Sequence, residues 1–265
     1  MPVKKDADGK RWVEMETLIP GTPEQVWQSM CTGPGMGTWF TRVTVEEHLG
    51  GKVSFDLGGS VSNAVVTAWQ PPKQFGYLES EWMPGAPPIA TELTISARND
   101  GKCLVRLVHS LFASKEDWDD QLESFEGGWA GFFDVLRVYQ ANFAGLKAAQ
   151  FSMMLPARGE ALEVWKRIVT SAGLEGANVG ERHKSSGGPQ PLDGTVEKTM
   201  QDARQRFVML RLDAPFKGIT SVGTYVGGDG VVMASAWTWV YGDDAETLAG
   251  KHEPQWRQWL EKMAG

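Results

Sequence analysis

The chain is poor in cysteine and has no long apolar run. Its 265 residues include only Cys31 and Cys103, too few for a disulfide framework or a zinc site built from thiolates. We therefore expect both as small core residues. No apolar stretch is long enough to cross a bilayer. Residues 1–12 contain basic side chains without an apolar segment after them, which disfavours a secretory signal and predicts a cytoplasmic protein.

Positive charge is also in short supply. The formal net charge is −7, which disfavours binding to nucleic acid through its phosphates. The four histidines are widely spaced and form no metal-binding motif, so neither a metal nor another cofactor is expected. They are His48, His109, His183 and His252.

Much of the acidic excess lies in one run. Its members are Glu116, Asp117, Asp119, Asp120, Glu123 and Glu126. The run has two interpretations. It stabilises the positive end of the helix that follows it, or it forms a docking surface for a basic partner.

The most informative stretch of the chain is Ile19–Phe40. Thr22 and Gln25 have the spacing of a capping box at a helix start, and the helix is predicted to end near the glycine-rich segment 33–37. A dinucleotide-binding loop follows a strand and opens a helix, whereas this segment follows a helix, so that interpretation is excluded. We predict a loop that turns the chain and is followed by the pair Trp39-Phe40.

An internal repeat predicts two copies of one architecture. The segment METLIPGTPEQVW, residues 15–27, aligns with MMLPARGEALEVW, residues 153–165, at an offset of 165 − 27 = 138 residues. Each copy is predicted as a strand, a helix, several strands and a closing helix. We therefore predict two domains, residues 1–148 and 149–265.

In the first copy, apolar alternation and turn signals predict seven strands. They are Trp12–Ile19, Thr41–Glu47, Lys52–Leu57, Val61–Trp69, Phe75–Trp82, Ile89–Arg98 and Cys103–Phe112. Two of these strands, Val61–Trp69 and Phe75–Trp82, have apolar residues on both faces, so their inner face stays unassigned. A closing helix over about Ser124–Leu146 carries an aromatic stripe that a curved antiparallel sheet would bury.

In the second copy the same signals predict a strand, a helix, a mobile loop over 173–194, four strands and a closing helix. The regular elements are Phe151–Ala157, Gly159–Ser171, Thr195–Met200, Arg206–Leu212, Gly218–Val226, Val231–Tyr241 and Asp244–Met263. Pro254 lies near the middle of the last helix, which predicts that this helix begins late.

Six short motifs of the first copy occur in a characteristic order. They are Pro-x-x-Val-Trp at Pro23, Val26 and Trp27, then Trp39-Phe40, Gly50-Gly51, Trp69-x-Pro-Pro, Leu107-Val108-His109-Ser110 and Gly128-Trp129. In this order, residues 12–147 resemble the SRPBCC superfamily, the helix-grip fold of START and birch-pollen-allergen proteins. Within it they resemble the branch of the heat-shock-protein-90 ATPase activator homologues. The second copy shares only its strand–helix start and its closing helix, and so looks like a degenerate copy.

The resemblance implies an α+β fold with two tandem helix-grip domains. In each, a curved antiparallel sheet wraps around a long C-terminal helix and leaves a cavity between them. It also implies that the first domain binds a small apolar or amphipathic ligand, lipids included. The side chains expected at this cavity are Trp39, Phe55, Trp82, Leu107, His109, Trp129, Phe132, Phe133 and Leu136.

Two other functions stay open at this point. Some branches of the superfamily have cyclase or dehydratase chemistry, for which His109 or the alternating pair Glu79 and Glu81 would supply acid–base groups. The simpler interpretations are a hydrogen-bonded core histidine and carboxylates on a solvated strand edge. The other alternative is a protein-interaction module that contacts a chaperone through the acidic run. Enzymatic activity and homodimer formation are left open.

Overall fold

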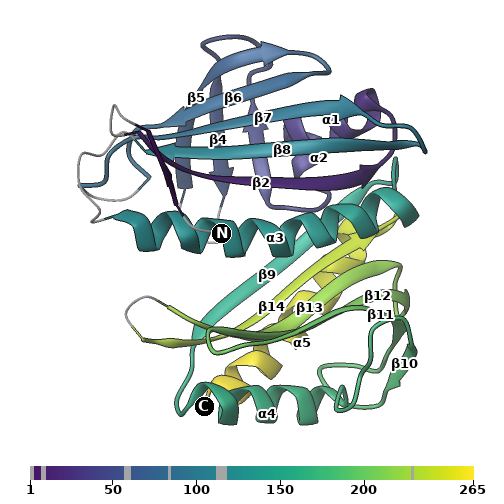
Figure 1. The fold of residues 1–265 in the computed structure, drawn as a ribbon. Helices are drawn as coiled ribbons and strands as arrows, with labels where there is room; N and C mark the ends of the chain where they lie inside the picture. The colour runs from purple at the N-terminus through teal and green to yellow at the C-terminus, as the bar shows by residue number, and fades with distance from the viewer. Residues whose placement is uncertain (1–2, 7–9, 57–60, 83–84, 112–117, 228–229) are drawn as a thin grey trace. The chain divides into compact units, whose positions relative to one another are not determined.

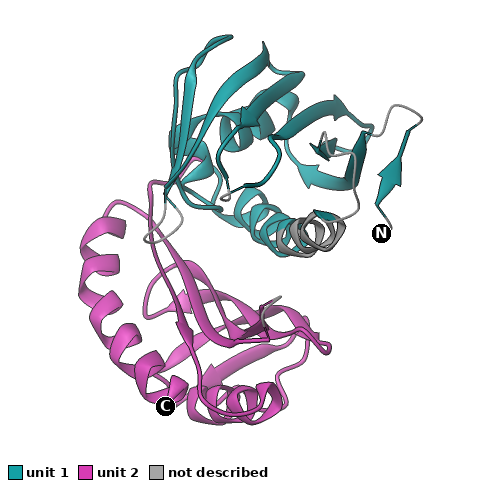
Figure 2. Cartoon of the chain, turned by 90° about the vertical axis from the view of Figure 1, so that its left-hand side faces the viewer, with its two compact units in different colours: residues 1–144 teal, residues 145–265 magenta. Residues whose placement is uncertain are grey.

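The computed structural model describes residues 3–6, 10–56, 61–82, 85–111, 118–227 and 230–265, without the side chains of residues 119–128. The chain divides into two compact units, Met1–Ala144 and Gly145–Gly265 (Figure 2). Each unit combines one antiparallel sheet with helices.

Unit 1 contains an eight-stranded sheet in the order β1-β2-β8-β7-β6-β5-β4-β3 (Figure 1). The last strand of the unit, β8, therefore pairs with the long strand β2 near its start. The strands are β1 (Lys4–Lys5), β2 (Arg11–Pro20), β3 (Arg42–Val45), β4 (Lys52–Asp56), β5 (Val61–Gln70), β6 (Gln74–Glu79), β7 (Ile89–Ala97) and β8 (Lys102–Leu111). All seven predicted strands are present, and Cys31 and Cys103 are buried as expected.

Two short helices connect β2 to β3. Helix α1 (Pro23–Cys31) begins with the predicted capping box, in which Thr22 and Gln25 satisfy each other's backbone N–H groups. The glycine-rich segment, predicted as a loop, instead forms the helical turn α2 (Gly33–Met36). The Thr32 hydroxyl caps this turn by accepting from the backbone N–H of Gly35, and glycine permits the close approach to α1 because a Cβ at Gly35 would collide with the Gln28 carbonyl.

The closing helix of unit 1 is α3 (Asp119–Asn142), which lies along the sheet beside β2 (Figure 1). It begins and ends earlier than predicted. Part of the acidic run therefore lies in its first turns, where negative charge is favourable at a helix N-terminus. The side chains of this run are outside the described residues, so its role as a docking surface stays a prediction. The apolar stripe packs inward, with Phe133, Leu136 and Tyr139 buried.

Unit 2 repeats the plan with a six-stranded antiparallel sheet in the order β10-β11-β12-β13-β14-β9. Here too the first strand pairs with the last. Its elements are β9 (Ala148–Pro156), α4 (Ala161–Ala172), β10 (Arg182–Ser185), β11 (Leu192–Gln201), β12 (Gln205–Ala214), β13 (Gly218–Val226), β14 (Val232–Tyr241) and α5 (Ala245–Ala264). Two tandem helix-grip domains, the second shorter and degenerate, are thereby confirmed.

Two predictions for unit 2 are wrong. The segment 173–194 is not a loop throughout, since it contains β10 and the start of β11, which pair as antiparallel strands. An ion pair between Arg182 and Asp193 at 2.8 Å also links them. The predicted bounds of the last helix, Asp244–Met263, agree with α5, but its late start is wrong, because the helix begins at Ala245 and runs through Pro254. The proline removes one backbone donor, but the buried side chains of Trp256 and Leu260 anchor the helix beyond it.

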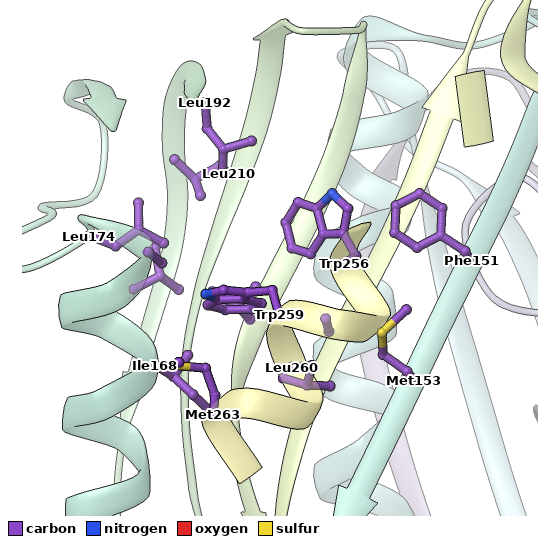
Figure 3. Close-up of a cluster of buried hydrophobic side chains, with 14 of the residues drawn as sticks. Phe151, Met153, Ile168, Leu174, Leu192, Leu210, Trp256, Trp259, Leu260 and Met263 are labelled. Atoms are coloured by element: carbon purple, nitrogen blue, oxygen red, sulfur yellow. The ribbon is translucent and has the colours of Figure 1, made fainter. Parts of the chain in front are cut away.

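The core of unit 2 lies between α4, α5 and the sheet (Figure 3). Trp256 of α5 lies beside Phe151 of β9 at a ring-centroid distance of 6.0 Å. The repeat seen in the sequence is a repeat of core anchors, because Trp27 of α1 and Trp165 of α4 are both only 4% exposed. An indole at this point fixes the first helix of each domain against its sheet.

Candidate functional site between the sheet and helix α3 of unit 1

Six aromatic side chains from the sheet, from α3 and from the segment after α2 form one group, which we call the ring cluster. Its members are Trp39, Phe40, Phe55, Trp129, Phe132 and Phe133. Phe40 stacks on Trp129 at 5.0 Å between ring centroids and meets Phe132 edge-on at 4.7 Å. Trp39 stacks on Phe133 at 6.3 Å, and its indole N–H donates to the Ser29 carbonyl. These are the geometries that aromatic pairs prefer.

The ring cluster is buried on one side and accessible on another. Trp39, Phe55 and Phe133 are at most 4% exposed, whereas Trp129 and Phe132 are only half-buried. Two rings of α3 are thus accessible to solvent although other rings pack against them. Leu107 on β8 and Leu136 on α3, also expected at the site, are fully buried in the core.

Trp82 lies in a different place from the ring cluster. It packs edge-on against Trp118 at 5.8 Å in a small apolar group with Val13, Ile89 and Leu111. Its indole N–H donates to the Pro87 carbonyl at 2.8 Å. The structure therefore places eight of the expected residues at the ring cluster or in the core, and Trp82 beside the start of α3.

A row of polar side chains crosses the inner face of the sheet next to the ring cluster. Tyr77, Thr91 and His109 pair in register across β6, β7 and β8. The Thr91 hydroxyl lies 2.9 Å from His109 Nδ1 and also hydrogen-bonds the Tyr77 hydroxyl. The His109 ring lies 5.7 Å from Trp129 of the ring cluster. We call these three residues the polar row.

Burial decides the charge of the polar row. It lowers the pKa of His109 to about 3, so the imidazole is neutral at pH 7. Burial likewise raises the pKa of Tyr77. His109 is therefore a hydrogen-bonded core histidine, as the simpler interpretation had it, and it also contacts the ring cluster.

Glu79 departs from the expectation of a solvated strand edge. It is two residues beyond Tyr77 on β6, so its side chain lies on the same inner face, and it is half-buried. The Ser62 hydroxyl donates to its Oε1 at 2.5 Å, and burial raises the pKa of the Glu79 carboxyl. Glu81, by contrast, is exposed. The alternation of Phe75, Tyr77 and Glu79 was the available signal for this placement.

On the outer face of the same sheet, Glu14 forms ion pairs with Arg106 at 2.6 Å and with Lys4 at 2.9 Å. The hydrogen bond from Arg106, with that from Lys4, lowers the pKa of Glu14 to about 2. Glu16, its alternate on β2, is exposed. The ion pairs of Glu14 therefore stabilise the outer face of the sheet.

Two other kinds of site have no support in the part of the chain that the structure describes. Within it, no three His, Cys, Asp or Glu side chains are grouped so that they could hold a metal ion. No helix there has the length and apolar character needed to cross a membrane.

The arrangement of a sheet, a capped first helix and an aromatic closing helix agrees with a family comparison. The model of the family described as Activator of Hsp90 ATPase homolog 1-like protein matches residues 20–141. The match covers most of unit 1, which is therefore similar to this family over nearly its whole length. No functionally curated protein matches the chain.

Solved structures similar to the chain match either nearly all of it or about half of it. The di-domain ARO/CYC BexL is 11% identical, with 96% of this chain and 97% of that one covered and a TM-score of 0.47. DynU16, described as a putative protein in the dynemicin biosynthetic locus, is 18% identical over 96% and 95% of the chains, with a TM-score of 0.43. CalU16 from Micromonospora echinospora is 22% identical over 53% of this chain and 83% of that one, with a TM-score of 0.42.

Proposed function

We propose that this protein binds a small hydrophobic or aromatic molecule between the sheet and α3 of unit 1. The observation that carries the proposal is the ring cluster, in which the half-buried rings of Trp129 and Phe132 adjoin the buried rings of Trp39 and Phe40. A flat apolar ligand on these rings would remove apolar surface from water and stack on aromatic faces.

The polar row supports a binding site more than a plain core. Ligand sites are largely apolar and contain a few polar groups that fix the orientation of the ligand. Thr91 and His109 are such groups, and His109 contacts Trp129 directly. They lie on the inner face of the sheet, beside the accessible rings of α3.

We place binding in unit 1 because unit 2 lacks the Trp39-Phe40 pair. In unit 2 the corresponding region between α5 and the sheet contains Trp256 and Trp259, which pack on each other at 5.9 Å. A degenerate copy of this kind serves the stability of the chain or its pairing with a second copy.

The test is a titration with naphthalene, followed through the ¹³C-methyl signals of leucine. The signals of Leu107 and Leu136 in unit 1 are expected to shift, while those of Leu260 in unit 2 stay in place. The variant Phe132→Ala is expected to bind about ten-fold more weakly, from the loss of part of a buried aromatic surface. The control Leu162→Ala changes an exposed residue of α4 and should bind as the parent does. Binding is ruled out if saturating naphthalene leaves the unit 1 signals of the folded protein unchanged.

A second candidate is an enzyme of the cyclase or dehydratase type. One observation favours it, namely that Tyr77, Thr91 and His109 form a continuous hydrogen-bonded row through which a proton could pass. The low pKa of His109, however, makes it a weak base at neutral pH. Unchanged turnover of a candidate substrate in His109→Ala would eliminate this version.

A further inference from the structure

The inner face of the unit 1 sheet has a second polar feature beside the polar row. The Ser62 hydroxyl on β5 donates a hydrogen bond to Glu79 on β6, and this bond uses one carboxylate oxygen, Oε1. A carboxylate has about four lone-pair positions, so further donors can be accommodated at Glu79. A half-buried carboxyl on a face that is otherwise mostly apolar requires an explanation, because burying such a group is unfavourable unless hydrogen bonds compensate.

This carboxyl adjoins the ring cluster. Ser62 is directly opposite Phe55 of the ring cluster across β5 and β4. Tyr77, two residues before Glu79, lies 5.3 Å from Phe55 between ring centroids. Phe55 and Tyr77 are themselves buried, so a ligand ring would enter beside the half-buried rings of Trp129 and Phe132 and direct its edge towards Phe55 and the Glu79 carboxyl.

We propose that Glu79, held by Ser62, accepts a hydrogen bond from a hydroxyl group of the ligand, so that the site takes uncharged hydroxylated aromatic molecules in preference to aromatic or aliphatic carboxylates. This inference rests on the proposed function, since it concerns the same site. It adds the chemical class of the ligand and a residue that determines specificity.

The charges on this face favour an uncharged donor over an anion. Glu79 would repel a ligand carboxylate. Arg11 also lies on the inner face, at the end of the cross-strand series Glu79, Ile89, Leu111 and Arg11. It is three strands away from Glu79, which is ~14 Å at normal strand spacing. Arg137 of α3 is paired with Asp134 and donates to Thr17 on β2.

The polar row strengthens the same preference. His109 is neutral, and Thr91 hydrogen-bonds both His109 and Tyr77, so no positive charge arises there to bind an anion at neutral pH. The raised pKa of Glu79 shows that its ionised form is destabilised by burial. A hydroxyl donor from the ligand would stabilise that form, because hydrogen bonds to ionised acceptors are the stronger ones.

The test compares three probes of one shape, namely naphthalene, 2-naphthol and 2-naphthoate, by the same methyl-signal titration. The parent protein is expected to bind 2-naphthol about ten-fold more tightly than naphthalene, and 2-naphthoate most weakly. In Glu79→Leu the preference for 2-naphthol should disappear while naphthalene still binds. Glu79→Gln, which keeps an acceptor oxygen, should restore part of it. Glu81→Leu, a change at an exposed position, should behave as the parent.

The failures of the two proposals are distinguishable. If none of the probes shifts the unit 1 signals, the proposed function fails and this inference fails with it. If naphthalene and 2-naphthol bind equally, or 2-naphthoate binds most tightly, the class of ligand is wrong although binding stands. A preference for 2-naphthol that persists in Glu79→Leu overturns the assignment of Glu79. Ser62→Ala provides a second variant with the same expected loss of preference if Glu79→Leu does not fold.

Discussion

The clearest prediction concerns His109 and the stability of unit 1 in acid. The imidazole is 3% exposed and lies between Val13 on β2 and Thr91 on β7. Burial lowers its pKa from 6.5 to about 3. A group whose pKa is lowered by folding stabilises the protein above its unfolded-state pKa, and this contribution is lost as the pH falls towards the folded-state pKa. The window for His109 therefore extends from about pH 6.5 down to about pH 3.

The magnitude follows from the same values. Between pH 7.5 and pH 4.5 the unfolded chain gains a proton at His109 while the folded chain does not. At ~1.4 kcal/mol per pH unit below 6.5, the free energy of unfolding of unit 1 should fall by about 3 kcal/mol from this residue. Glu14 and Glu79 also titrate in acid, so the quantity that isolates His109 is the difference in pH dependence between the parent and His109→Gln.

The assay is urea unfolding at pH 7.5 and at pH 4.5. Unfolding of each unit is monitored through the hydrogen exchange of peptides from β8 in unit 1 and from β13 in unit 2. His109→Gln can still hydrogen-bond Thr91, and it should lose about 3 kcal/mol less stability in β8 than the parent does on acidification. The signal from β13 should be unaffected. His48→Gln, at an exposed position, is the matched control and should keep the parent's pH dependence. Equal acid sensitivity of the parent and His109→Gln would refute the argument.

Two further predictions concern the frame of unit 1. Hydrogen bonds from Arg106 and Lys4 lower the pKa of Glu14 to about 2, so the stability that these ion pairs contribute is lost as the pH falls from about 4.5 to 2. Because the cationic partners are exposed, Glu14→Gln should remove only about 1 kcal/mol of this acid-dependent stability. An unchanged acid midpoint in Glu14→Gln would contradict this. Gly35→Ala should destabilise unit 1 by about 1–3 kcal/mol in urea unfolding, because the new methyl group collides with the Gln28 carbonyl. On α3, a methyl group added by Gly131→Ala meets open space, so this variant should stabilise unit 1 by about 0.5–1 kcal/mol. A loss of stability in Gly131→Ala would show that the effect of Gly35→Ala is not specific to the collision with Gln28.

Local patterns predicted much of the fold because they are local in origin. The capping box at Thr22 and Gln25 satisfies backbone groups within four residues of the chain. The alternation in Lys52–Asp56 and Ile89–Ala97 needs only the two-residue period of a strand. The exceptions were segments whose conformation depends on distant partners. Segment 33–37 folds as a helical turn against α1, and β10 forms because β11 pairs with it.

The inner face of β5 needed the tertiary structure for a specific reason. A β-bulge between Val66 and Ala68 shifts the register of β5 against β6. A bulge inserts a residue and disrupts the two-residue period, so alternation in the sequence alone does not assign the inner face of β5. The placement of Glu79 beside Ser62 follows from the pairing and could not be predicted from either strand by itself.

The sequence by itself indicated the family that unit 1 resembles, the repeat marked by Trp27 and Trp165, and most of the side chains of the ring cluster, because these depend on residue type and spacing along the chain. Only the tertiary structure decided which of those rings stay accessible, that Trp82 packs elsewhere, and that Tyr77, Thr91 and His109 form one row. Burial and cross-strand contacts are properties of residues far apart in the chain. Their pairing sets both the neutral state of His109 and the position of Glu79.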